Sequence, residues 1–147
     1  YADAFLDAGA ATLTFHIEVD RQDRRRNQHL IDQIRAAGAR AGLAINPDGD
    51  VAWLEPYLPS LDLVLVMSVF PGFGGQKFMP EVLAGVRRLR DLGYAGDIEM
   101  DGGIGPETIG ACAAAGTNVF VSGTGVFGAS DWTARIAQLR ATARAAS

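Results

Sequence analysis

The chain has 147 residues, 48% of them apolar, with a formal net charge of −4 and a pI near 5.0. This length suits one domain with its own core, and the acidic balance argues against a nucleic-acid partner. A single cysteine excludes an internal disulfide and is typical of a reducing cytoplasm, while no apolar run approaches the roughly 20 residues of a membrane helix.

Strand-like and helix-like patterns alternate along the chain. Residues 61–69 are apolar on both faces, as in a buried parallel strand, and residues 80–93 carry the apolar stripe of an amphipathic helix. In the closing helix we expect Trp132, Ile136 and Leu139 to face inward. The predicted order is the tail of a helix 2–9, strand 11–19, helix 28–38, strand 39–45, short helix 50–58, strand 61–69, helix 80–93, strand 96–100, helix 105–116, strand 118–123 and helix 131–146.

Five strand–helix units with short connections predict a parallel α/β sheet in a single domain over residues 1–147. The repetition exists only at the level of the strand–helix unit. Such repetition occurs both in (β/α)8 barrels and in doubly wound sheets.

Glycine-rich segments follow the last three predicted strands: "FPGFGGQ", "DGGIG" and "SGTG". In parallel α/β folds the loops after the strands carry the site, and glycine lets backbone N–H groups converge on an anion. The pattern therefore predicts a phosphorylated ligand held by backbone. The alternative is a set of glycine-rich turns or a lid without a ligand.

Asp101 is the sharpest single candidate, because it ends the fourth strand on the same face as Asp97 and Glu99. An acidic residue there is a candidate metal ligand or general acid/base. The alternative is a carboxylate that accepts backbone N–H groups in its turn. His16 is expected to be a hydrogen-bonded structural residue, and Cys112 a buried small hydrophobe.

Five segments occur in the order and spacing found in ribulose-phosphate 3-epimerases, and the sequence resembles that family over essentially its whole length. They are "TFHIE", "GLAINP", "LVMSVFPGFGGQKF", "IEMDGGIGPET" and "AAGTNVFVSGTGVF". The resemblance implies a (β/α)8 TIM barrel of the ribulose-phosphate-binding type. It also implies interconversion of ribulose 5-phosphate and xylulose 5-phosphate with two aspartates and one divalent metal ion (Zn, Fe, Mn or Co).

The resemblance assigns roles to individual residues. Asp101 matches the aspartate that both ligates the metal and transfers a proton, and Met67 matches a methionine that lines the pocket. The residues matching the substrate loop and the phosphate grip are Gly72, Phe73, Gly74, Gly75, Gly102, Gly103, Gly123 and Thr124.

The family's second aspartate and its two metal-binding histidines lie in H-x-D and H-x-M motifs, and neither motif occurs here. The resemblance therefore implies an incomplete barrel of five βα units, the C-terminal portion, and we expect a homo-oligomer. Three alternatives stay open. They are a 3-epimerase of another ketose phosphate such as allulose 6-phosphate, a lyase or synthase on a similar barrel, and a truncated non-catalytic protein that binds sugar phosphate or a partner.

Overall fold

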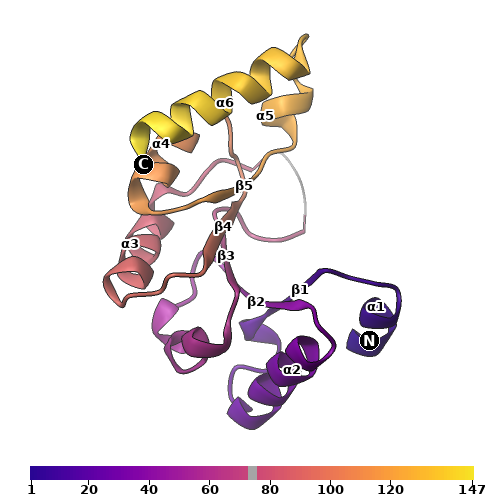
Figure 1. Ribbon diagram of the computed structural model, residues 1–147. Helices are drawn as coiled ribbons and strands as arrows, with labels where there is room; N and C mark the ends of the chain where they lie inside the picture. The colour runs from indigo at the N-terminus through magenta and orange to yellow at the C-terminus, as the bar shows by residue number, and fades with distance from the viewer. Residues whose placement is uncertain (73–75) are drawn as a thin grey trace.

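The structure, a computed structural model, describes residues 1–72 and 76–147 and contains one twisted parallel sheet (Figure 1). Its strands pair in the order β1-β2-β3-β4-β5, and every pair is parallel. The predicted parallel α/β sheet is thus confirmed. The strands are β1 Thr12–His16, β2 Arg40–Ile45, β3 Leu63–Met67, β4 Asp97–Asp101 and β5 Val119–Val121.

Helices connect successive strands, and short 3-10 turns occupy several of the same connections (Figure 1). The α-helices are α1 Ala2–Asp7, α2 Arg24–Ala36, α3 Leu83–Asp91, α4 Ile109–Ala115, α5 Thr124–Phe127 and α6 Trp132–Ala146. The 3-10 helices are η1 Ile17–Val19, η2 Val51–Trp53, η3 Glu55–Ser60 and η4 Pro80–Val82. Among the described residues, no helix has the length and apolar character needed to cross a bilayer.

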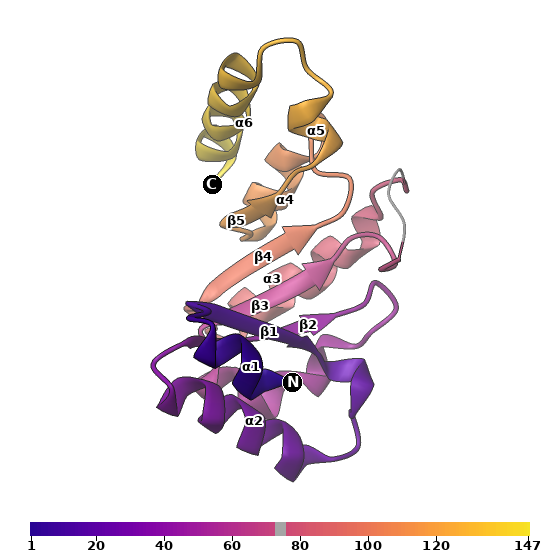
Figure 2. The same cartoon turned by 90° about the vertical axis from the view of Figure 1, so that its right-hand side faces the viewer.

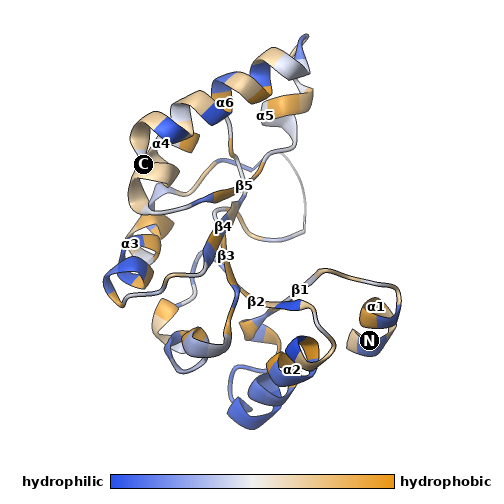
Figure 3. Cartoon of the chain, in the orientation of Figure 1, coloured by the Kyte–Doolittle hydropathy of each residue, from blue (hydrophilic) through white to orange (hydrophobic). Residues whose placement is uncertain are grey.

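The core lies between one face of the sheet and the helices. On β4, Ile98 and Met100 are fully buried against this core, whereas the alternate residues of the same strand are only partly buried. Helix α3 supplies Val86 and Leu89, which are also fully buried. Figure 3 shows hydrophobic and hydrophilic residues side by side on α2 and α3, as in amphipathic helices with one buried face.

Local chemistry fixes the helix boundaries. The side chain of Asp23 accepts a hydrogen bond from the backbone N–H of Arg26 (2.9 Å), so α2 begins at Arg24, earlier than the predicted 28. Asp131 caps α6 in the same way through the N–H of Ala134 (2.9 Å). The left-handed Gly116 ends α4.

Three sequence expectations were wrong in detail. The first predicted strand was extended to residue 19, but β1 ends at His16 and η1 follows. The predicted helix 50–58 is two 3-10 helices, because the prolines in "EPYLPS" remove the N–H donors that an α-helix needs. In α6 Leu139 is buried, but Trp132 and Ile136 are 54% and 38% exposed.

A polar network joins three strands at their amino ends. Asp97 of β4 accepts hydrogen bonds from the guanidinium of Arg40 on β2 and from the side-chain amide of Asn118 (2.7 Å) just before β5. These hydrogen bonds, that from Arg40 first, hold the pKa of Asp97 below its usual range. Contacts at this end of a parallel sheet serve stability, since the site lies at the other end.

We expect Asp97→Asn to lower the free energy of unfolding by about 1 kcal/mol at about pH 7, because a charge-assisted network is lost. A lowered folded-state pKa stabilises above the unfolded value near 4, and this stabilisation disappears as pH falls through the folded value. The difference between parent and variant should therefore shrink as pH falls below about 4. Urea unfolding at about pH 7 and at a series of lower pH values measures it, with the exposed Asp48→Asn as control. A difference independent of pH would contradict the ionic explanation.

Candidate functional site

An open hollow of about 480 Å³ lies where β3, β4 and β5 end. Figure 2 shows that the arrowheads of β3 and β4, which mark their carboxyl ends, point to the same side of the molecule. The hollow brings together seven of the ten residues predicted for the site, while Phe73, Gly74 and Gly75 lie outside the described residues. Its lining is Met67, Val69, Phe70, Pro71, Gly72, Gln76, Asp101, Gly102, Gly103, Gly123 and Thr124.

Asp101 is the last residue of β4 and stands in register with Met67 on β3 and Val121 on β5. It is partly buried, and within residues 1–72 and 76–147 its carboxylate accepts no hydrogen bond from the protein. Its backbone carbonyl, by contrast, accepts from Ser68 through the N–H (2.8 Å) and the hydroxyl (3.1 Å). The backbone is thus fixed while the carboxylate stays available to a ligand.

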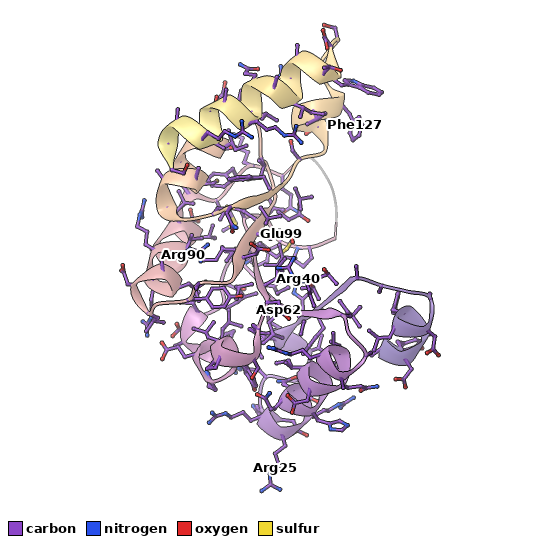
Figure 4. All side chains as sticks on the ribbon, in the orientation of Figure 1. Arg25, Arg40, Asp62, Arg90, Glu99 and Phe127 are labelled. Atoms are coloured by element: carbon purple, nitrogen blue, oxygen red, sulfur yellow. The ribbon has the colours of Figure 1, made fainter. Side chains whose placement is uncertain are left out.

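The three acidic residues of β4 have different surroundings. Asp97 belongs to the polar network at the amino end, and Asp101 lines the hollow at the carboxyl end. Glu99 lies between them at the middle of the sheet (Figure 4). Burial, and then the charges of Asp101 and Asp97, raise the pKa of Glu99. Of the three, only Asp101 can reach a ligand in the hollow.

The turn after Asp101 requires glycine for two reasons. Gly102 and Gly103 have φ angles of 128° and 65°, which side chains disfavour. A Cβ atom on Gly102 would also lie 2.6 Å from the Cγ2 atom of Val69, and one on Gly103 would lie 2.9 Å from the backbone nitrogen of Phe78. The backbone of this turn can therefore approach its neighbours, and a ligand, more closely than any other residue would allow.

Gly123, which follows β5, differs from these two glycines. Its φ is negative, at −88°, and among the described residues a Cβ atom there would meet nothing within 4 Å apart from its chain neighbours. Lack of space therefore does not require glycine at this position. Because Gly123 lines the hollow, the space beside its backbone is open to a ligand in the hollow.

Sequence reasoning did not select Val69, Pro71 or Gln76, which also line the hollow. Pro71 and Gln76 belong to the glycine-rich stretch after β3, so their position beside the predicted residues was the available signal. The side-chain amide of Gln76 donates to the carbonyl of Phe70 (2.6 Å) and so joins the two ends of this segment.

The remaining candidates lie away from the hollow. The Nδ1 atom of His16 is 3.4 Å from a carboxylate oxygen of Glu18, whose other oxygen accepts from the N–H of Asn46 (2.7 Å). This contact does not meet the geometry of a hydrogen bond, so the hydrogen-bonded structural role of His16 stays a prediction. Cys112 is fully buried in α4, and burial raises the pKa of its thiol to about 11, so it is no ready nucleophile.

The divalent metal ion that the family resemblance implies needs several side-chain ligands close together. In the described part of the chain, no three residues among the histidines, cysteines, aspartates and glutamates come close enough together to hold a metal ion. Among the described residues that line the hollow, Asp101 alone offers a carboxylate, and one carboxylate does not make a metal site. The described residues therefore do not by themselves fit the metal.

A parallel sheet with glycine-rich loops and a carboxylate at the carboxyl ends of its strands is an arrangement that (β/α)8 barrels use for their sites. The structure of 3-hexulose-6-phosphate synthase from Salmonella typhimurium has the same fold. It superposes with a TM-score of 0.73 at 18% identity over 99% of this chain and 67% of that one. A second 3-hexulose-6-phosphate synthase gives a TM-score of 0.70 at 22% identity, over 96% and 66% of the two chains. These neighbours confirm the predicted fold class.

The family model described as "Ribulose-phosphate 3 epimerase family" matches residues 1–127, and the chain belongs to this family. It is 46% identical over 143 residues to the cytoplasmic isoform of ribulose-phosphate 3-epimerase from Oryza sativa subsp. japonica, covering 95% of this chain and 61% of that protein. It is also 46% identical over 154 residues to ribulose-phosphate 3-epimerase from Mycobacterium tuberculosis, covering 100% and 64%. The chain thus spans less than two thirds of the length of these relatives.

Proposed function

We propose that this chain carries part of the active site of an epimerase that interconverts ribulose 5-phosphate and xylulose 5-phosphate. One observation carries the proposal: a carboxylate without a protein partner among the described residues, Asp101, lines the same hollow as three glycines that the resemblance assigns to phosphate. Family membership and the named relatives support the choice of substrate.

Epimerisation at C3 removes a proton from one face of the sugar and returns one to the other face through an enediolate. Each face therefore needs its own acid/base group. Asp101 serves one face, and it is the one titratable side chain among the described residues that line the hollow. The partner on the other face has to come from residues outside this lining.

The phosphate end of the substrate lies against backbone. None of the described residues that line the hollow is basic, whereas four of them are glycines. Peptide N–H groups donate well to phosphate oxygens, and a fixed phosphate places the reacting carbon at a set distance from Asp101. Met67 and Val69 give the hollow apolar walls that exclude water from the reacting carbon.

The divalent metal ion stays an implication of the family resemblance. Asp101 is the described carboxylate that could contact it, and the other ligands would have to come from outside the described residues. The substrate is the small-molecule partner in this proposal, and a homo-oligomer remains a prediction.

The full-length protein should be incubated with ribulose 5-phosphate in D2O and followed by NMR. Xylulose 5-phosphate should form with deuterium at C3, because the returned proton comes from an acid/base group that exchanges with solvent. Allulose 6-phosphate, tested in parallel, should react more slowly. Turnover of allulose 6-phosphate alone would redirect the proposal to a different ketose phosphate, and no deuterium in either sugar would contradict it.

A further inference from the structure

Three hydroxyl groups from three separate segments each donate a hydrogen bond to one of three consecutive backbone carbonyls. The pairs are Ser68 to Gly102 (2.6 Å), Thr108 to Gly103 (2.9 Å) and Ser122 to Ile104 (2.7 Å). The donors follow β3, precede α4 and follow β5, so they surround the turn on several sides. We call Ser68, Thr108 and Ser122 the hydroxyl clamp.

The clamp fixes the direction of the N–H groups in the same peptides. No described peptide bond is cis, and in a trans peptide the carbonyl of one residue and the N–H of the next point opposite ways. The N–H groups of Gly103, Ile104 and Gly105 therefore each point away from the hydroxyl that binds the carbonyl of the same peptide. That of Gly105 returns to the Thr108 hydroxyl (3.0 Å).

The other two N–H groups have no acceptor among the described residues. Within the part of the chain that the structure describes, neither Gly103 nor Ile104 donates a backbone hydrogen bond. Ile104 is only 3% exposed, and backbone N–H groups in such surroundings are nearly always paired. Gly103 lines the hollow and Ile104 is the next residue, so a ligand in the hollow is the source of acceptors that these two adjacent donors point to.

Without the clamp this turn would have little to hold it. Gly102 and Gly103 are both in left-handed conformations, and glycine changes conformation more easily than any other residue. Ser68 and Thr108 each prevent a rotation of the peptide plane that carries the N–H of Gly103 or Ile104, and Ser122 does the same for the next peptide. Donors held in place before the ligand arrives bind more tightly, because no ordering is left for the binding step.

We propose that Ser68, Thr108 and Ser122 are positioning residues of this turn: Ser68 and Thr108 aim the N–H groups of Gly103 and Ile104 at the substrate phosphate, and Ser122 holds the next peptide in place. This inference rests on the proposed function. It adds three side chains that touch neither the substrate nor the reacting carbon. Ser68 is the most buried of them, with no exposed surface, and its carbonyl also accepts from the N–H of Met79 (2.9 Å).

Thr108 offers the cleanest test, because it is only partly buried and because two amino acids of similar shape each lack one of its two groups, the hydroxyl or the methyl. Thr108→Val keeps the shape and removes the hydroxyl, whereas Thr108→Ser keeps the hydroxyl and removes the methyl group. Ser68 suits the test less well, since its hydroxyl also contacts the carbonyl of Asp101 (3.1 Å). Both variants should be made in the full-length protein and checked for unchanged circular dichroism.

The first readout is a titration with inorganic phosphate, followed through the amide NMR signals of Gly103 and Ile104. In the parent these two signals should shift as phosphate binds. In Thr108→Val the Kd for phosphate and the KM for the sugar phosphate should rise about fivefold, the value of one hydrogen bond, with kcat within about twofold. Thr108→Ser should stay within about twofold of the parent in all three quantities.

Each other outcome has a definite meaning. If Thr108→Val binds phosphate as the parent does, the clamp is wrong while the phosphate site stands. The same holds if both variants lose affinity equally, because then the hydroxyl is not what matters. If phosphate leaves the Gly103 and Ile104 signals of the parent unmoved, the phosphate site of the proposed function is itself wrong, and the clamp with it.

Discussion

Replacing Asp101 by asparagine should lower epimerase turnover by about 10²–10⁴-fold, the usual contribution of a general acid/base. The amide has nearly the same shape as the carboxylate but cannot take a proton from C3 of the sugar. The fold should survive, because within the described residues the carboxylate accepts no hydrogen bond and only the backbone of Asp101 is held by Ser68.

Asp97→Asn is the matched control for this variant, since it makes the same chemical change on the same strand and the same face. Asp97 belongs to the network with Arg40 and does not line the hollow. Its turnover should stay within about threefold of the parent under conditions where both are folded. A loss of less than tenfold in Asp101→Asn, or equal losses in both variants, would overturn the role of Asp101.

The different surroundings of the three acidic residues of β4 follow from the geometry of a parallel sheet. Parallel strands bring all their carboxyl ends to one edge, so Asp101 and the glycine-rich turns meet there, while Asp97 meets Arg40 at the opposite edge. Glu99 lies between the two and has a raised pKa because burial disfavours its charge. One short acidic strand thus contains a structural carboxylate, a partly buried one and one that is open to a ligand.

Sequence patterns predicted the fold well where periodicity and burial agree. Residues 61–69, apolar on both faces, contain β3, and the stripe in residues 80–93 contains α3. The prediction for Trp132 and Ile136 was wrong because a stripe indicates which face is apolar, not how much neighbouring structure covers it. In α6 the described neighbours bury Leu139 and leave those two residues largely exposed.

For the site, pattern reasoning selected the residues whose type is unusual at a strand end. Asp101 and the glycines are conspicuous there, and the structure places the described ones around one hollow. The hydroxyl clamp could not be found in this way. Serine and threonine are common in turns, and the role of Ser122 depends on Ile104, a residue 18 positions away in the chain. Only the folded geometry relates the three hydroxyls to consecutive carbonyls.

Gly123→Val should raise the KM for the sugar phosphate and the Kd for inorganic phosphate by about 10–100-fold. The added side chain would keep the phosphate from the backbone N–H groups, and charge-assisted hydrogen bonds of this kind are worth about 1.5–3 kcal/mol. The valine side chain would enter the hollow, because among the described residues beyond its chain neighbours no atom lies within 4 Å of the point that a Cβ atom would occupy. Gly102→Val is unsuitable for this purpose, since its Cβ would collide with Val69 and disturb the fold.

Two controls separate loss of ligand space from other effects. Gly110→Ala introduces a side chain inside α4 with only an ordinary contact to Thr142 (3.4 Å) and should leave binding unchanged. Lys77→Ala removes an exposed cation close in sequence to the hollow and should change KM by no more than about threefold, since exposed ion pairs contribute at most about 1 kcal/mol. If Lys77→Ala instead raises KM most while Gly123→Val binds normally, then side-chain charge rather than backbone holds the phosphate.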